Sequence, residues 1–161
     1  MAAKNGDEEV VQILLDKGAS TNAVSESSTT ALYEASRNWD QKVVEILLEH
    51  GAATEPEDLC NGIALHAAAE TGHFRIVEIL LDHKANPKFQ DEDGHTALHK
   101  AAENGYERIV GILLEKGASV GIQDNDDRTA LQLAAENGHQ NVVEILEKHV
   151  KPGGKLSSVV N

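Results

Sequence analysis

The fold of this chain is decided by a stretch near its middle, Thr96-Ala97-Leu98-His99-Lys100-Ala101-Ala102-Glu103-Asn104-Gly105. Thr96 predicts a helix start, because a threonine hydroxyl can accept a hydrogen bond from one of the unpaired backbone N–H groups there. Leu98, Ala101 and Ala102 follow at helical spacing and form one apolar face. Gly105 predicts the helix end, since glycine takes the left-handed conformation without a steric penalty. The stretch is therefore expected to form a short, slim helix.

A second and bulkier helix is predicted directly after Gly105. Its broad apolar side is formed by Ile109, Val110, Ile112, Leu113 and Leu114. Lys116 and Gly117 are expected to end this helix, with a cation at the negative end of its dipole and a glycine at its C-terminal cap. The polar run that follows is typical of a turn and is centred on Asp124-Asn125-Asp126-Asp127.

The same pattern recurs every 33 residues along the chain. The leucines of the first helix stand at this step, and so do alanines and isoleucines of both helices: Leu32, Leu65, Leu98 and Leu131; Ala2, Ala35, Ala68, Ala101 and Ala134; Ile13, Ile46, Ile79, Ile112 and Ile145. One helix pair cannot bury its apolar faces alone, whereas stacked neighbours can. The repeat therefore predicts an all-α solenoid of stacked antiparallel helix pairs.

These residues resemble the ankyrin repeat, which has a period of 33 and a T-P-L-H-x-A pattern. The pattern appears as Thr96-Ala97-Leu98-His99-Lys100-Ala101, with related copies that begin at Thr30, Ile63 and Thr129. The resemblance implies an ankyrin-repeat solenoid whose β-hairpin-like loops project on one side. It also implies a concave surface of inner helices and loop tips that binds other proteins. We expect an ankyrin repeat domain over 1–150, with a partial repeat at 1–24, repeats at 25–57, 58–90, 91–123 and 124–150, and a flexible tail at 151–161.

Several positions depart from the repeat. Ile63 replaces the capping threonine, so its helix is expected to lack a hydroxyl cap, at a cost of about 1 kcal/mol. Trp39 stands where other repeats have glycine, and a bulky residue is strained in a left-handed turn. We expect either that Asn38 takes that conformation or that the preceding helix ends differently. Lys84 replaces the terminal glycine of a second helix. The repeat at 25–57 is predicted to be the least regular.

The two ends of the repeat array differ. Met1 aligns with Glu34, so the first repeat lacks the front of its inner helix, and we expect the chain to be a piece of a longer array. At the other end, Glu147 replaces the leucine of the other repeats. A polar residue at this position suits a solvent-facing terminal repeat.

Composition excludes several function classes. The formal net charge of −13 argues against nucleic acid and against an anionic membrane surface, since both are bound through Lys and Arg. The single cysteine, Cys60, excludes an internal disulfide and a Cys-rich zinc site, and is read as an exposed thiol. No secretory signal or membrane span is visible, because residues 1–6 are polar and the longest apolar run, 109–114, is short. We expect an intracellular protein of the cytoplasm or the nucleus.

The sequence offers no pattern for catalysis or for cofactor or metal binding. Among the eight histidines, His66 and His99 lie one repeat apart and are interpreted as structural, and His73 and His139 are expected to form local hydrogen bonds. His95 and His99 are four apart, but Thr96 places His95 outside the helix, which disfavours a metal pair. No G-x-S-x-G, G-x-G-x-x-G or P-loop motif occurs.

The sequence therefore predicts a monomeric, non-enzymatic module that binds another protein through a concave acidic surface. The segment 91–127 holds nine acids and three bases, which favours a partner with a basic surface. The alternative is a passive scaffold or spacer segment of a larger multidomain ankyrin-array protein. The resemblance places the partner-binding residues at loop tips and inner-helix positions, to which the exposed Trp39 is added: Glu26, Ser27, Arg37, Asn38, Trp39, Leu59, Cys60, Glu70, Thr71, Glu92, Asp93, His95, Lys100, Glu103, Asn104, Asn125, Asp126, Arg128, Glu136 and Asn137.

Overall fold

The computed structural model describes residues 2–55 and 63–150. Within these ranges it contains ten helices, which alternate between a shorter and a longer one after the first repeat. Their bounds are α1 Ala2–Asn5, α2 Glu8–Asp16, α3 Ala31–Arg37, α4 Gln41–Glu49, α5 Ala64–Glu70, α6 Phe74–Asp82, α7 Ala97–Glu103, α8 Glu107–Glu115, α9 Ala130–Glu136 and α10 Gln140–Glu147. The expected helix pairs are thus present in every repeat.

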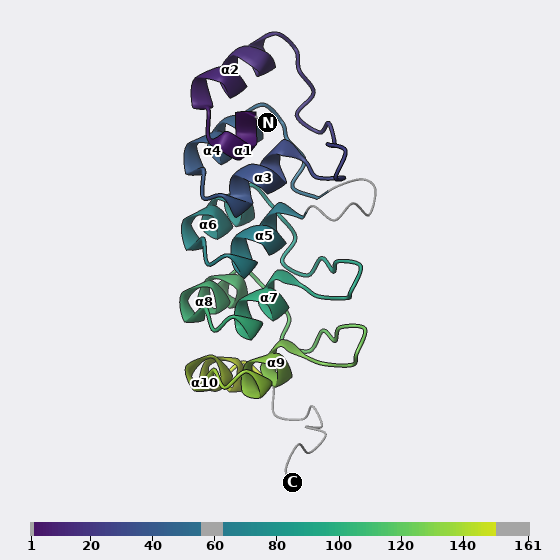
Figure 1. Cartoon of the computed structure of the whole chain (residues 1–161). Helices are drawn as coiled ribbons and strands as arrows, with labels where there is room; N and C mark the ends of the chain where they lie inside the picture. The colour runs from purple at the N-terminus through teal and green to yellow at the C-terminus, as the bar shows by residue number, and fades with distance from the viewer. Residues whose placement is uncertain (1, 56–62, 151–161) are drawn as a thin grey trace.

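The helix pairs stack into one elongated array (Figure 1). The short helices α1, α3, α5, α7 and α9 form an inner row, the long helices form an outer row, and the loops project on the side of the inner row. Contacts run both within each pair and between neighbouring pairs, as between α5 and α7. In the described ranges, strand-like pairing is limited to isolated bridges such as Gln123 to Thr129, which are hairpin-like. The prediction of an all-α solenoid is confirmed.

The core runs along the whole stack between the two rows. Alanines such as Ala68 and Ala101 are fully buried on the inner helices, where small side chains let helices approach closely. Branched residues such as Ile109, Val110 and Leu113 fill the space on the outer helices. Burial of apolar area is the main stabilising term, at about 25 cal/mol per Å². The slim inner helix and the bulky outer helix predicted from the sequence are both present.

The inner helices begin as the sequence predicts. The Thr30 and Thr129 side chains accept hydrogen bonds from the backbone N–H groups three residues on. The Thr96 backbone N–H and hydroxyl both contact Nδ1 of His99, at 3.1 Å and 2.8 Å. Ile63 has no side-chain cap, which confirms the expected loss in that repeat.

The prediction for the turn after α3 was wrong. Trp39 itself takes the left-handed conformation, with φ of 67°, while Asn38 has φ of −93°. Helix α3 ends at Arg37, in register with the other inner helices. The Trp39 ring stacks on His73 of the next repeat, with ring centroids 5.6 Å apart. Packing of the stack therefore holds this turn in the geometry that glycine has elsewhere.

The expectation that the repeat at 25–57 is the least regular is not met by its helices. Helix α3 has seven residues and α4 has nine, the same lengths as α7 and α8. In its described residues, 25–55, the repeat departs from the later ones at the left-handed Trp39 and at Ser25, which stands in place of a loop aspartate.

The first repeat has the short inner helix that the sequence predicts, since α1 has four residues. Its outer helix leaves Val10, Ile13 and Leu14 about half exposed. The matching residues of the second repeat, Val43 and Leu47, are buried, because a repeat packs on each side of them. At the far end Glu147 is exposed, as expected for a solvent-facing position. Among the helices in the described part of the chain, each is too short or too polar to span a membrane.

Candidate functional site

The candidate site is the inner face, which we define as the loops 25–30, 91–96 and 124–129 together with the exposed side chains of the five inner helices. Each of the last two loops is built around one aspartate. Oδ1 of Asp91 accepts from the backbone N–H groups of Asp93 and His95, at 3.1 Å and 2.8 Å. Oδ1 of Asp124 does the same for Asp126 and Arg128, at 2.9 Å and 2.8 Å. These short aspartates fold the loops into tight turns, because their side chains satisfy backbone donors two and four residues on.

The loop at 25–30 forms the same turn, but a weaker side-chain hydrogen bond holds it. Ser25 stands where the other loops have aspartate, and its hydroxyl accepts from the N–H of Thr29 at 3.2 Å. Its hydroxyl also contacts those of Ser27 and Thr29, each at 2.9 Å. A neutral hydroxyl bonds backbone donors less strongly than a carboxylate does. This loop therefore keeps the turn but is less strongly fixed.

The loops at 91–96 and 124–129 are also bonded to each other. The backbone N–H of Asn125 donates to the Asp93 carbonyl at 3.0 Å, and the Asn125 side chain donates to the Glu92 carbonyl at 2.8 Å. Gln90 adds a third bond, from its amide to the Gln123 carbonyl at 3.0 Å. These three bonds join two neighbouring repeats at their loop tips.

A charged network lies beneath these two tips. The Asp124 side chain is fully buried, and its Oδ2 lies 3.2 Å from Nε2 of His95 and 3.0 Å from Nε of Arg128. Nζ of Lys100 contacts Nδ1 of His95 at 3.0 Å and Oδ2 of Asp91 at 3.3 Å. Burial alone would raise the pKa of Asp124, but hydrogen bonds from Arg128 and Asp126 hold that pKa below its usual value. Asp124 therefore keeps its negative charge at neutral pH and holds Arg128 and the loop backbone in place.

The two buried histidines are structural, as the sequence predicts. Nε2 of His66 donates to the His95 carbonyl at 2.9 Å, and Nε2 of His99 donates to the Arg128 carbonyl at 3.2 Å, so each ties its inner helix to the next loop. Burial lowers the pKa of His99, and it lowers the pKa of His66 to about 4. Nδ1 of His66 is buried without a hydrogen-bond partner, because Ile63 lacks the hydroxyl that Thr96 supplies to His99.

His73 and His139 correct the prediction of local hydrogen bonds. Nε2 of His73 donates to the Arg37 carbonyl at 3.0 Å, and Nε2 of His139 donates to the Glu103 carbonyl at 2.9 Å. Both bonds cross to the preceding repeat. These histidines therefore join neighbouring repeats at the end of the inner helices that lies away from the loops.

The predicted loop-tip residues fall into two groups. The first group is exposed to solvent and consists of Glu26, Ser27, Glu92, Asp93 and Asp126. The Asp126 side chain forms an ion pair with Arg128 and is still 74% exposed. The second group forms the hydrogen bonds and ion pairs within and between the loops, and consists of His95, Lys100, Asn125 and Arg128. Leu59 and Cys60 lie outside the described residues.

The predicted inner-helix residues divide in the same way. The side chains of Thr71, Asn104 and Asn137 donate to carbonyls four residues back, and that of Asn38 donates to the Lys4 carbonyl, so all four have structural bonds at helix ends. The other predicted residues here are exposed, and their side chains make no ion pair within the described ranges: Arg37, Glu70, Glu103 and Glu136. Trp39 is 64% exposed, at the opposite end of α3 from the loop.

One group of potential metal ligands occurs in the described residues. Ligand atoms of Asp91, Asp93 and His95 lie within 4.8 Å of one another. Oδ1 of Asp91 already accepts two backbone hydrogen bonds, and both ring nitrogens of His95 face Lys100 and Asp124. Asp91 and His95 therefore already serve bonds within and between the loops, and their positions are accounted for without a metal ion.

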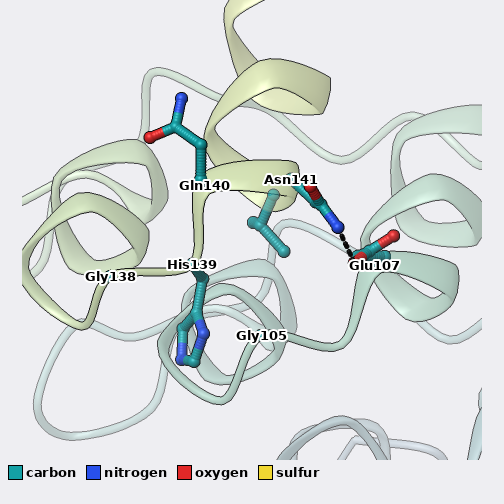
Figure 2. A pocket seen from close by; sticks show the side chains of 7 residues that line it. Gly105, Glu107, Gly138, His139, Gln140 and Asn141 are labelled. Atoms are coloured by element: carbon teal, nitrogen blue, oxygen red, sulfur yellow. Dashed lines mark hydrogen bonds between the residues drawn. The ribbon is translucent and has the colours of Figure 1, made fainter.

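The described part of the surface includes two hollows of similar volume. Figure 2 shows one, with a volume of about 300 Å³, where His139 lies beside Gly105 and Asn141 donates to Glu107 at 2.7 Å. Gly105 leaves room for this ring because it has no side chain; a Cβ there would collide with the His139 imidazole. Of its polar side chains, Asn141 bonds Glu107 and His139 bonds the Glu103 carbonyl, so both serve contacts between repeats.

The second hollow is a groove of about 320 Å³ between α1 and the loop at 25–30. Ala3, Ala23, Val24 and Ala31 give it apolar walls. Val24 is 56% exposed and stands where later repeats have Gln90 and Gln123, whose amides bond neighbouring loop carbonyls. Sequence reasoning missed this groove, although the change from glutamine to valine at one repeat position was a visible signal.

Comparison with known proteins agrees with this geometry. A family model described as ankyrin repeats (three copies) matches residues 1–58 and 65–155. No curated protein matches the chain.

Proposed function

This chain belongs to the ankyrin-repeat family, whose members generally act as protein–protein interaction modules, and on that premise we propose that its inner face binds a partner protein with a basic surface. The observation that carries the proposal is the row of exposed carboxylates on braced loop tips. Glu92, Asp93 and Asp126 are exposed there, while the positive charges nearby are engaged in holding the loops. A basic partner would complement this arrangement.

The hydrogen bonds between the two loops should also raise the affinity for a partner. Association loses the conformational freedom of every loop that must be ordered, at about 0.5–1.5 kcal/mol for each immobilised side chain. The bonds from Asn125 to Glu92 and Asp93 order the two tips before any partner arrives. Exposed carboxylates also attract a basic partner over distance, which raises the association rate at low salt. We therefore expect fast, salt-sensitive binding.

We propose binding without catalysis. Each histidine near the loops uses at least one ring nitrogen in a hydrogen bond that holds the structure; these residues are His66, His95 and His99. A general base must instead reach a proton on a substrate. Ankyrin-repeat proteins are typically non-enzymatic interaction modules, which supports the same reading.

The test is affinity capture with the full chain followed by mass spectrometry. The variant carries Glu92→Lys, Asp93→Lys and Asp126→Lys, and we expect it to lose a basic partner that the unaltered chain retains. The matched control carries Glu49→Lys, Glu115→Lys and Glu144→Lys on exposed outer-helix positions, which changes the net charge equally.

Three results are distinguishable. Loss of a saturable partner from the loop variant alone supports the proposal. Equal loss from both variants shows that only net charge matters, and equal retention shows that the loop carboxylates are not used. Absence of any saturable partner favours the alternative of a scaffold or spacer segment.

A further inference from the structure

A charge gradient runs along the inner face from one end of the stack to the other. Five residues share one repeat position near the end of successive inner helices, and the first two are basic while the last three are acidic: Lys4, Arg37, Glu70, Glu103 and Glu136. All five are exposed, and none forms an ion pair in the described ranges. Their charges are therefore available to a partner.

The basic end of this row meets the apolar groove. Lys4 belongs to both, since it lines the groove together with Ala3 and Val24. Glu34 also lines it, but its carboxylate accepts a hydrogen bond from the Thr29 hydroxyl at 2.9 Å and so faces its own loop. The half-exposed Val24 offers apolar surface that the glutamines of later repeats do not. This end therefore combines a place for an apolar side chain with two unpaired cations.

The spacing of the row suits an extended segment. Packed helices lie about 8–10 Å apart, so the five positions cover roughly 40 Å. An extended chain advances about 3.3 Å per residue, and about a dozen residues span that length. A segment lying along the row would meet cations at one end and carboxylates at the other.

We propose that the partner presents an extended segment of about a dozen residues that binds along the inner face in one direction. Its apolar side chain enters the groove beside Val24, its acidic end pairs with Lys4 and Arg37, and its basic end pairs with Glu103 and Glu136. This inference rests on the proposed function and adds the polarity of the bound segment. The reverse placement would set like charges against each other at both ends, which is unfavourable.

The probes are three fluorescent twelve-residue peptides of one composition, titrated against the full chain by fluorescence anisotropy. In the first, a leucine and the glutamates come first and the lysines last; the second has the reverse order, and the third alternates the charges. Because the chain direction of the partner is open, we expect either the first or the second peptide to bind at least tenfold more tightly than the other two.

Two sets of variants complete the test. The charge swap carries Lys4→Glu, Arg37→Glu, Glu103→Lys and Glu136→Lys, leaves net charge unchanged, and should transfer the preference to the peptide of reverse order. Val24→Gln, which installs the residue of later repeats, should weaken the preferred peptide about tenfold. Ile13→Gln, at an equally exposed apolar position on outer helix α2, should leave its affinity unchanged.

Equal affinity for all three peptides, or no binding of any of them, overturns the inference. So does a charge swap that leaves the preference in place, or a Val24→Gln variant that binds like the unaltered chain. The proposed function is judged separately by the capture experiment, which depends on the loop carboxylates and not on the row or the groove.

Discussion

The two halves of the array have the same backbone but different side-chain support. Between residues 90 and 150, the loops are folded by aspartates, joined by Asn125 and Gln90, and followed by helices capped with threonine. Between residues 24 and 84, Ser25 replaces an aspartate, Ile63 replaces a threonine and Lys84 replaces a glycine. The helix lengths are nevertheless nearly the same in both halves: each inner helix from α3 to α9 has seven residues, and the outer helices have nine except α10, which has eight.

This contrast teaches that stacking fixes the helices, whereas local side chains fix the loops. The buried alanines and branched residues recur in both halves, so the core is the same. The polar motif residues recur fully only in the later half. We therefore expect substitutions at matching positions in the two halves to have unequal effects.

The largest expected difference concerns the loop aspartates. Asp124→Ala removes a buried carboxylate that holds Arg128 and two backbone N–H groups, and we expect a loss of about 3–5 kcal/mol in unfolding free energy. The matching Ser25→Ala should cost under about 1 kcal/mol, because Ser25 is exposed and makes a longer bond. Urea unfolding followed by circular dichroism measures both, and equal losses would remove the contrast between the halves.

The next effect is a pH dependence that arises from His66. Its pKa is about 4 in the folded chain, whereas an unfolded histidine has a pKa of about 6.5. The unfolded chain therefore binds more protons between these values, so stability should fall as pH drops from about 6.5 to about 4, by about 3 kcal/mol. The difference in unfolding free energy between the unaltered chain and His66→Gln, which installs the residue found at Gln132, isolates this contribution. A pH-independent difference would contradict the burial of a neutral histidine.

The cap of α7 should show a smaller effect. Thr96→Val gives this repeat an apolar cap like Ile63 and removes the hydroxyl contact with Nδ1 of His99, at an expected cost of about 1–2 kcal/mol. Ile63→Val, the control in the earlier half, changes no hydrogen bond and should cost about 1 kcal/mol for its lost methylene. Thermal unfolding of both variants at pH 7.5 tests the difference, and a Thr96→Val chain as stable as its parent would show that the cap does not matter.

The sequence predicted the two rows of helices, but it did not predict the Trp39 conformation, the bonds between loops or the apolar groove. The step of 33 residues predicted both helix rows, because the apolar positions Leu98 and Ile112 recur without insertion. The left-handed Trp39 was not predicted, since its conformation follows from the stack and from the His73 ring rather than from local preference. The hydrogen bond from Asn125 to Glu92 joins residues 33 apart in the chain, so no local sequence pattern predicts it. The same holds for the apolar groove, whose walls come from two repeats.

The smallest expected effect lies at the end of α6. Lys84 is left-handed, with φ of 69°, and its side chain is exposed, so Lys84→Gly should stabilise the chain by about 0.5–1 kcal/mol. The reciprocal Gly117→Lys, at the same repeat position with open space around it, should destabilise by a similar amount. Chemical denaturation of the pair checks the sign, and a stabilised Gly117→Lys chain would contradict the assignment of strain to this position.

The most direct test of the central claim is hydrogen–deuterium exchange of the chain with and without its captured partner. Because the claim is that partners bind the inner face, slowed exchange is expected at the loops 91–96 and 124–129 and along α3, α7 and α9, while the outer helices α4, α8 and α10 keep their rates. Slowing confined to the outer helices, with the loops unchanged, would contradict the account.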